Sequence, residues 1–388
     1  MFASRTDWPL QTNRLTKELE TLKKNGVSVI DLTESNPTRA GFSYPQDKII
    51  SALADSEVLA YEPSPKGMLK ARKAIADDYH EKGIKVHPEQ IFLTASTSEA
   101  YSLVFRLLLN PGENVLSPRP SYPLFDFLAG LSDVALHSYP LVDQHGWQID
   151  SKKLADIVTP QTKALILVNP NNPTGSYVKK NELEEINRFA RSRHLALIAD
   201  EVFFDYALQP DSKRAPSFAG NQDVLTFTLS GISKALGLPQ MKLGWMVVSG
   251  PEELVRSASA RLEIICDTYL SVNTPAQIAL PEWFCLKEKI QSQILTRIKE
   301  NREFLVSKLS AHSCKLLQVE GGWYAALQLP DTKSEEEWAL EFLRQDHVYV
   351  HPGYFFDFDG EAPHVVLSLL PNREVFQEGI KKILMRAQ

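Results

Sequence analysis

The sequence predicts an α/β protein with a mostly parallel sheet and a second, smaller α+β part. Two observations lead to this prediction. Between about residues 66 and 275, short strands alternate with helical segments, and the strands are apolar throughout, which is typical of a parallel sheet buried on both faces. The chain has 388 residues, and since single cores stop growing beyond roughly 250–300 residues, we expect two packed regions.

The chain should begin with a helix over 14–25 that ends at Asn25-Gly26, followed by a short strand over Val27–Leu32 and a loop over 35–38. Hydrophobic periodicity predicts the alternation that follows. In chain order it comprises a helix over 66–81, a strand over 91–94, a helix over 98–109, strands over 114–117 and 164–168, a helix over 179–193, and strands over 195–199 and 224–229.

The pattern changes after residue 275. We expect one long helix over about 276–311, strands near 314–319 and 323–329, a helix near 333–345, strands near 347–351 and 364–369, and a last helix over about 373–386. We therefore place a larger domain at 46–285 and build the smaller domain from both chain ends, 1–45 and 286–388.

Composition excludes several function classes. Forty-two basic and 48 acidic residues give a net charge of −6, which argues against a nucleic-acid partner, because phosphate neutralisation needs a positive field. No apolar run approaches the ~18 residues of a membrane-spanning helix, and the N-terminus lacks the apolar core of a signal peptide. We expect a cytoplasmic protein without a membrane partner.

The three cysteines, Cys266, Cys285 and Cys314, are widely spaced and form no metal-binding pattern. We expect no metal site, and three partly buried thiols in a reducing compartment.

Four short segments at predicted strand ends are candidates for chemistry, because ligands of open α/β sheets bind at the carboxyl ends of the strands. Residues 94–100 can cap a helix or hold a phosphate. Residues 169–175 form a rigid turn that can fix an asparagine amide. Asp200 needs a cation or donor at the end of a buried strand. Lys234 lies in a turn of small residues, where a lysine of lowered pKa can form Schiff bases. For residues 94–100 a helix cap without a ligand remains an alternative, and for residues 169–175 a turn without a functional role remains one.

Taken together and in this order, these segments resemble the fold-type I pyridoxal-phosphate (PLP) enzymes, in particular the class I/II aminotransferases of the aspartate aminotransferase superfamily. The resemblance covers about residues 28–385 and is strongest at Asn171–Gly175, Asp200–Val202 and Ser230–Lys234. It implies a seven-stranded type of sheet in the large domain, PLP as cofactor, and ping-pong transfer of an amino group from an amino acid to a 2-oxo acid. A carbon–sulfur β-lyase on the same fold is the alternative, and a non-catalytic PLP-binding regulator is less favoured.

The resemblance also assigns roles. Lys234 matches the lysine that bonds covalently to PLP and moves a proton during transfer, and Asp200 matches the aspartate that pairs with the pyridine nitrogen. Asn172 matches the asparagine at the ring oxygen, and Tyr122 the aromatic that stacks on the ring. The other cofactor-binding matches are Ser96, Thr97 and Ser98 at the phosphate, Ser233 beside the lysine, Lys242 at the phosphate, and Tyr61, which reaches a neighbouring subunit. The Tyr61 match implies a homodimer with shared active sites.

Three positions depart from the family pattern. Lys242 replaces an arginine at the phosphate, and Phe203 replaces a tyrosine that donates a hydrogen bond to the ring oxygen. Val366 stands where the family has the arginine that binds the substrate carboxylate. Arg39 is the candidate replacement, although a solvent-exposed surface arginine explains it equally simply. Arg373 is a second possibility, but the first turn of the last helix explains it better.

Aromatic residues dominate the segments that match the substrate side of the family. Trp323 and Tyr354 are the substrate-binding candidates among them, and they indicate a bulky, apolar or aromatic amino donor. Core packing is the plain alternative for part of this set.

Overall fold

The largest feature of the computed structural model, which describes residues 1–142, 146–310, 312–358 and 362–388, is a sheet of eight described strands. From one edge to the other these are β2 (Ile91–Thr94), β9 (Gly244–Ser249), β8 (Thr226–Gly231), β7 (Ala196–Asp200), β6 (Thr162–Val168), β3 (Asn114–Arg119), β4 (Ala135–Val142) and β5 (Gln148–Ile149). The pairings from β8 to β4 are parallel, whereas β9 is antiparallel to both neighbours and β5 is antiparallel to β4. The α/β class is confirmed, with the two-residue β5 added at one edge.

Both faces of this sheet are buried. In β6, Ile166 and Val168 pack into one apolar cluster, and the alternate residues Leu165 and Leu167 pack into another. The helices that contribute to the first cluster are α4 (Thr97–Leu108), α5 (Phe125–Leu131) and α9 (Glu252–Tyr269), and those that contribute to the second are α6 (Ser151–Ile157) and α7 (Lys180–Arg193). Helices on two sides explain why the strands are apolar throughout instead of alternating.

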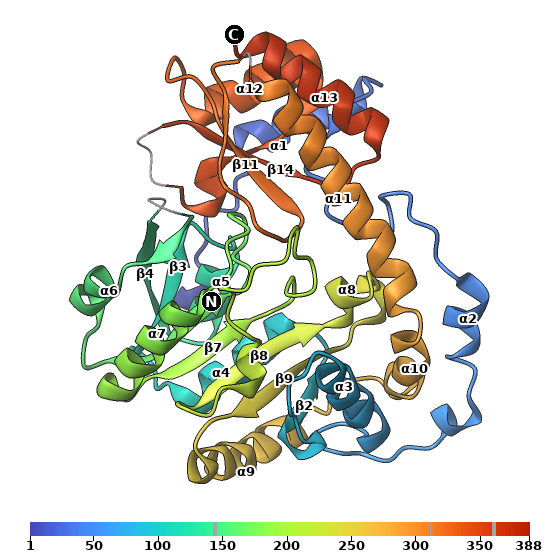
Figure 1. Ribbon diagram of the computed structural model, residues 1–388, viewed down its shortest axis with the longest axis vertical. Coiled ribbons are helices and arrows are strands. Elements are labelled where there is room, and N and C mark those ends of the chain that lie inside the picture. The colour runs from blue at the N-terminus through green and yellow to red at the C-terminus, as the bar shows by residue number, and fades with distance from the viewer. Residues whose placement is uncertain (143–145, 311, 359–361) are drawn as a thin grey trace.

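A second group of elements lies beside the sheet and combines both ends of the chain (Figure 1). Its antiparallel sheet has the order β10 (Lys315–Leu316), β11 (Tyr324–Gln328), β14 (His364–Ser368) and β13 (His351–Pro352). The helices are α1 (Arg14–Lys24), α11 (Lys287–Leu309), α12 (Glu335–Asp346) and α13 (Arg373–Arg386). A parallel pairing of β1 (Ile30–Asp31) with β12 (Val348–Tyr349) joins the N-terminal segment to the C-terminal part. The domain boundaries themselves stay a prediction.

The prediction of one long helix over 276–311 is wrong. Two helices occupy this stretch, α10 (Thr274–Phe284) and α11, and Cys285 and Leu286 separate them. The backbone N–H of Leu286 bonds three residues back to Trp283, so the four-residue spacing of an α-helix is interrupted there.

Other corrections concern short elements. The strand expected near 347–351 is two strands, because β12 pairs with β1 and β13 pairs with β14. Strands β4 and β9 and helix α9 were not anticipated, nor were α2 (Gln46–Ser51) and α5. Helix α3 (Leu69–Glu81) begins slightly later than predicted. Among the three thiols, Cys285 is exposed, not partly buried, whereas Cys266 and Cys314 are buried.

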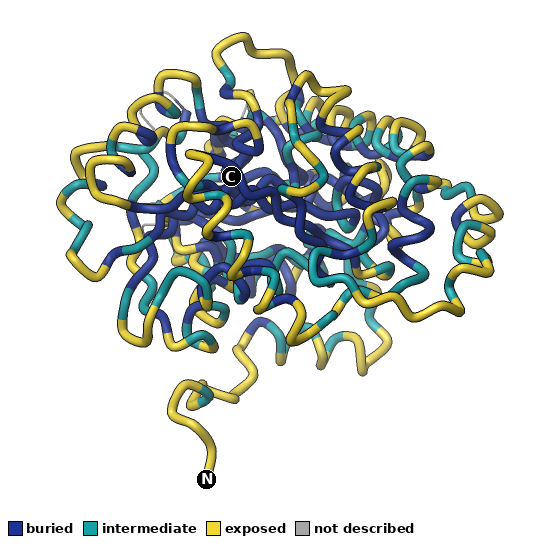
Figure 2. Tube along the Cα trace, turned by 90° about the horizontal axis from the view of Figure 1, so that it is seen from below, coloured by how far each residue is buried: buried dark blue, intermediate teal, exposed yellow. Residues whose placement is uncertain are grey.

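The buried strands run through the middle of the molecule, and the N-terminal segment is exposed and projects from it (Figure 2). In the described part of the chain, no helix combines the length and the apolar character needed to cross a membrane.

Candidate cofactor and substrate site

A cavity of about 290 Å³ lies at the carboxyl ends of β2, β6, β7 and β8. It brings together most of the residues singled out from the sequence, namely Ser96, Thr97, Ser98, Tyr122, Asn172, Asp200, Ser233 and Lys234. Its wall also includes Tyr101, Phe203 and Tyr324, together with Ser35 from the N-terminal segment. Segments far apart in the sequence therefore meet at the sheet edge where a ligand was expected.

One end of the cavity is the beginning of helix α4. The Ser96 hydroxyl accepts a hydrogen bond from the Glu99 backbone N–H at 3.2 Å, which caps the helix. Gly244 lets this turn approach the sheet closely, since a Cβ there would lie 3.2 Å from the backbone of Ser96 and 3.1 Å from the carbonyl oxygen of Ser230. The N–H groups of a first helical turn and the helix dipole form a binding site for an anion such as a phosphate.

Lys234 follows β8 and lies in the single-turn helix α8 (Ile232–Ala235). Its amine is close to two aromatic faces, with Nζ 4.7 Å from the ring centroid of Trp323 and 5.4 Å from that of Phe203. Burial lowers the pKa of Lys234 to about 8, although the Asp200 charge acts in the opposite direction. Near neutral pH a useful fraction of the amine is therefore unprotonated, as a nucleophile requires.

Asp200 ends β7 and is buried in the cavity wall. It accepts hydrogen bonds from the Tyr101 hydroxyl at 3.0 Å and from the Val202 backbone N–H at 3.2 Å. Burial raises the pKa of Asp200 to about 6, and these two donors partly offset that rise. Sequence reasoning missed Tyr101, although it follows Thr97 by one helical turn and so shares its face of α4.

The neighbouring carboxylate, Glu201, does not line the cavity. It accepts hydrogen bonds from the Ser217 hydroxyl, from the Phe218 backbone N–H at 2.9 Å and from the Asn169 side chain at 3.3 Å. Burial raises the pKa of Glu201 to about 7. Glu201 thus ties the end of β7 to the 217–218 segment, whereas Asp200 faces the ligand space.

Five predicted site residues do not line this cavity: Arg39, Tyr61, Lys242, Trp323 and Tyr354. Trp323 is fully buried behind the wall, where its ring faces the Lys234 amine. Lys242 is exposed and takes a left-handed backbone conformation with φ of 49°. Arg39 is exposed in a turn, and Tyr354 is 43% exposed.

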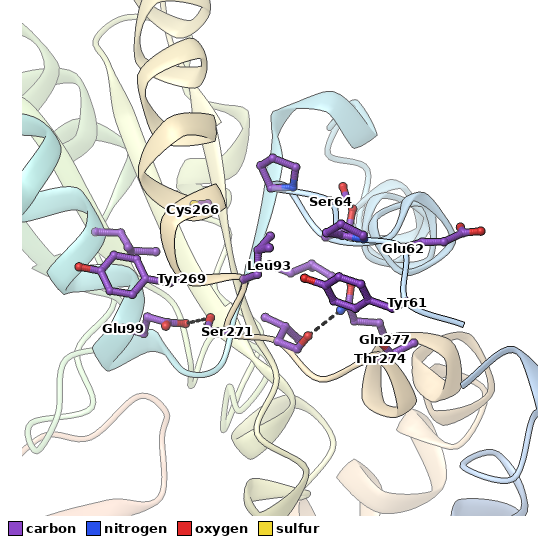
Figure 3. A pocket seen from close by; sticks show the side chains of 16 residues that line it. Tyr61, Glu62, Ser64, Leu93, Glu99, Cys266, Tyr269, Ser271, Thr274 and Gln277 are labelled. Carbon is purple, nitrogen blue, oxygen red and sulfur yellow. Dashed lines mark hydrogen bonds between the residues drawn. The ribbon is translucent and has the colours of Figure 1, made fainter. Parts of the chain in front are cut away.

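Tyr61 lines a second, smaller cavity that opens between α10 and the end of α9 (Figure 3). Gln277, Ser271 and Glu99 also line it, and the Ser271 hydroxyl donates a hydrogen bond to Glu99 at 2.7 Å. Because the Tyr61 side chain is 78% exposed, it is available to a neighbouring molecule.

The position of the expected carboxylate-binding arginine is apolar. Val366 is 1% exposed and packs in a cluster with Leu317, Ala326, Phe356 and Phe358. Among the described residues that line the cavity there is one lysine and no arginine.

The chemistry of these residues fits PLP. The start of α4 suits the phosphate, Asp200 suits a cationic ring nitrogen, and the Lys234 amine suits a carbonyl carbon. The Asn172 side chain is buried in the cavity wall, and its Oδ1 has no hydrogen-bond partner among the described residues, so no bond to that oxygen fixes the amide away from a ligand. Within the described ranges, no group of three or more histidine, cysteine or carboxylate side chains is arranged to hold a metal ion.

Known proteins resemble the chain over nearly its whole length. The family described as "Aminotransferase class I and II" matches residues 27–372. The glutamate–pyruvate aminotransferase AlaA of Escherichia coli strain K12 is 29% identical over 377 residues, 94% of this chain and 92% of that protein. The alanine aminotransferase of Mycobacterium tuberculosis strain H37Rv is 30% identical over 365 residues, 90% of this chain and 83% of that protein.

The structure resembles the same group. The alanine aminotransferase of Pyrococcus furiosus superposes with a TM-score of 0.89 at 25% identity, covering 100% of this chain and 99% of that one.

The chain is also similar in sequence to a lyase. The S-alkyl-thiohydroximate lyase SUR1 of Arabidopsis thaliana is 28% identical over 327 residues, 79% of this chain and 69% of that protein. Because the family match spans residues 27–372 and the fold agrees with it, the chain belongs to the class I and II aminotransferases and is a PLP-dependent aminotransferase.

Proposed function

We propose that Lys234 is the residue that bonds to PLP and carries the proton during amino transfer. The observation that supports this most is a buried amine with a pKa near 8 in the same cavity as a buried carboxylate. Bound PLP supplies an electron sink for the bonds at the substrate Cα. Asp200 holds the positive charge of the ring nitrogen, and Tyr101 fixes the orientation of that carboxylate.

The remaining cofactor contacts are proposed from the lining of the cavity. Ser96, Thr97 and Ser98 surround the phosphate, Tyr122 covers one ring face, and Asn172 donates to the ring oxygen, with Ser233 beside the lysine. Lys242 lies outside the lining residues, so we propose that it contributes only a distant positive charge at the phosphate end.

Phe203→Tyr gives a test of the ring-oxygen environment. The added hydroxyl would donate to the ring oxygen and stabilise its negative charge. The pKa read from the visible absorbance of the bound cofactor should therefore fall by about one to two. Phe204→Tyr is the matched control, because Phe204 packs on Tyr177 instead of lining the cavity. An unchanged pKa in Phe203→Tyr contradicts the proposed placement of the ring.

The amino donor, in this proposal, has a bulky apolar or aromatic side chain. Phe203, Tyr122 and Tyr324 line the cavity, and Tyr324 packs against Phe203 and Phe356 behind it. Tyr122 and Phe203 adjoin the cofactor in this proposal, so Tyr324 is the aromatic ring left for the substrate side, where it favours large apolar groups. Two relatives are named for alanine or glutamate, so a small or acidic donor is the second candidate.

A spectral screen separates the two donor classes. The PLP-loaded enzyme is mixed with one amino acid at a time, and the loss of the cofactor's visible absorbance is followed without a 2-oxo acid. Phenylalanine, tyrosine, leucine and methionine should react faster than alanine and glutamate; the reverse order contradicts the bulky-donor proposal. Product analysis also tests the β-lyase alternative that the similarity to SUR1 supports, because cleavage of the Cβ–S bond of a sulfur-containing amino acid releases a thiol together with pyruvate and ammonia.

The substrate carboxylate, in this proposal, is bound by Arg39, which lies four residues after the cavity residue Ser35. Arg39→Ala should raise the KM of the amino donor by about 10-fold or more and change kcat less, because a charged hydrogen bond to the ground state is lost. Arg373→Ala tests the second candidate, and because Arg373 is an exposed residue at the start of α13, its KM should equal that of the wild type. Equal KM values for Arg39→Ala and the wild type would refute this role.

We also propose a cytoplasmic homodimer with shared active sites. Large apolar side chains near Tyr61 are exposed: Leu59, two residues before it, at 89%, and Tyr269, which lines the same cavity, at 52%. Burying such side chains against a second copy is favourable. Sedimentation equilibrium of the PLP-loaded protein should give twice the chain mass, and a monomer would contradict the shared site. Fractionation of the source cells would test the compartment.

A further inference from the structure

Four charged side chains form a closed, alternating ring between α3, α11 and the segment that follows β7. Lys82 Nζ lies 2.9 Å from Asp78 Oδ2 and 2.7 Å from Asp205 Oδ1. Lys287 contacts Asp78 as well and lies 3.0 Å from Asp205 Oδ2. The four side chains, between 8% and 27% exposed, are called the charge ring below.

The charge ring fixes geometry more than it adds stability. The attraction within a buried ion pair roughly offsets the free energy lost when its two charges leave water. Moving one partner away leaves the other charge buried and unpaired, which is strongly unfavourable, so the four side chains keep a single arrangement. Burial alone would raise the pKa of Asp205, yet Lys82 and Lys287 hold it well below its usual range. Asp205 is therefore a permanently charged, immobile acceptor.

The charge ring connects directly to the turn that carries Lys234. Gln291 follows Lys287 by one turn of α11, and its Nε2 donates to Asp205 Oδ2 at 3.0 Å and to the Ala235 carbonyl at 2.8 Å. Tyr206, the residue after Asp205, donates its hydroxyl to the Lys234 carbonyl at 2.6 Å. Helix α8 has only four residues, and its last carbonyls take donors from outside the helix. The Lys234 carbonyl accepts from the Gly237 backbone N–H at 3.3 Å as well as from Tyr206, and the Ala235 carbonyl accepts from Gln291.

The amine of Lys234 itself is not held by a hydrogen bond in the described part of the chain. Its close neighbours are the ring faces of Trp323 and Phe203. The position of Nζ is therefore set mainly through the Lys234 backbone. Reaction geometry is sensitive to displacements of about 1 Å, so restraints on that backbone matter for catalysis.

We propose that Gln291 and Tyr206 are positioning residues for Lys234, which fix the turn that carries the amine and are themselves fixed by the charge ring. The proposal rests on Lys234 being the residue that bonds to PLP. Neither side chain lines the cavity, so both act through the lysine-bearing turn and not on the substrate.

Gln291→Leu tests the proposal in the PLP-loaded enzyme. This variant keeps the side-chain volume and removes the donor to Ala235. We expect kcat to fall by about 10- to 100-fold with little change in KM, and PLP to be released faster from the resting enzyme. Gln293→Ala is the matched control, because Gln293 lies on the same helix but bonds to Ser43. The proposal is overturned if kcat and the PLP release rate of Gln291→Leu equal those of the wild type or of Gln293→Ala.

Tyr206→Phe is the second test and removes one hydroxyl only. It should also accelerate PLP release and shift the pH midpoint of the bound cofactor's absorbance, a readout that general destabilisation does not move. An unchanged release rate and midpoint would overturn the role of Tyr206. An active Lys234→Ala would instead show that the proposed function is wrong, and that result is distinct from the outcomes for Gln291→Leu and Tyr206→Phe.

Discussion

Lys234→Ala is expected to abolish amino transfer, lowering kcat by at least about 10⁴-fold. The variant removes both the buried amine that bonds to PLP and the group that moves a proton at the substrate. The side chain has no substitute nearby, since it is the one lysine among the described residues that line the cavity. Single-turnover kinetics with saturating PLP would measure the loss, and the visible absorbance of the lysine-bound cofactor should disappear as well.

Lys234→Arg separates the chemistry of the amine from its charge. A guanidinium stays protonated at all accessible pH values, so this variant keeps a positive charge but loses the nucleophile. We expect it to be as inactive as Lys234→Ala. Lys289→Ala, an exposed lysine on α11, is the control and should match the wild type. Substantial turnover by Lys234→Arg would mean that charge alone suffices and would remove the basis of the proposed function.

The parts of the site that could be predicted are those encoded in contiguous stretches. The apolar run 164–168 predicted a strand buried on both faces. Helices cover the sheet on both sides, so neither face of this strand carries the polar residues of a solvent-exposed face. Lys234 and Asp200 could be placed at one sheet edge because Asp200 ends one such strand and Lys234 comes shortly after another. Parallel neighbours then bring these ends together without further information.

What the sequence could not predict depends on contacts between distant residues. Tyr101 and Asp200 are 99 positions apart, and Gln291 and Ala235 are 56 apart, so no local pattern reports either hydrogen bond. The break between α10 and α11 was missed because apolar positions continue across it with helical spacing. Strand β4 was missed because its middle residues, His137 and Ser138, are exposed and polar.

Asp200→Asn is the prediction with the second-largest effect. The substitution keeps the size of the side chain and removes its charge, so a cationic ring nitrogen would lose its partner inside a buried site. Truncating one side of a buried charge pair costs about 2–5 kcal/mol, which corresponds to a kcat lower by about 30- to 5,000-fold. Steady-state kinetics at saturating PLP would measure it.

Glu201→Gln is the matched control, since Glu201 is the next residue and is just as buried. Its carboxylate bonds to Ser217 and Phe218 on the other side of the strand, so kcat should stay near the wild-type value. Its effect should appear in stability instead. Because burial raises the pKa of Glu201 from 4.5 to about 7, the folded protein holds a proton that the unfolded chain releases. The free energy of unfolding of the wild type therefore falls as pH rises from about 4.5 through 7, and Glu201→Gln should lack that part of the decrease.

The two variants together distinguish a role in the reaction from the general consequence of altering a buried acid. If the charge of Asp200 matters only for folding, Asp200→Asn and Glu201→Gln will resemble each other in kcat and in the pH dependence of unfolding. If Asp200 pairs with the ring nitrogen, only Asp200→Asn will lose kcat. In that case Tyr101→Phe should give a smaller loss in the same direction, because it removes a donor that partly offsets the rise in the pKa of Asp200. A normal kcat in Asp200→Asn would contradict the pairing, whatever the stability of the variant.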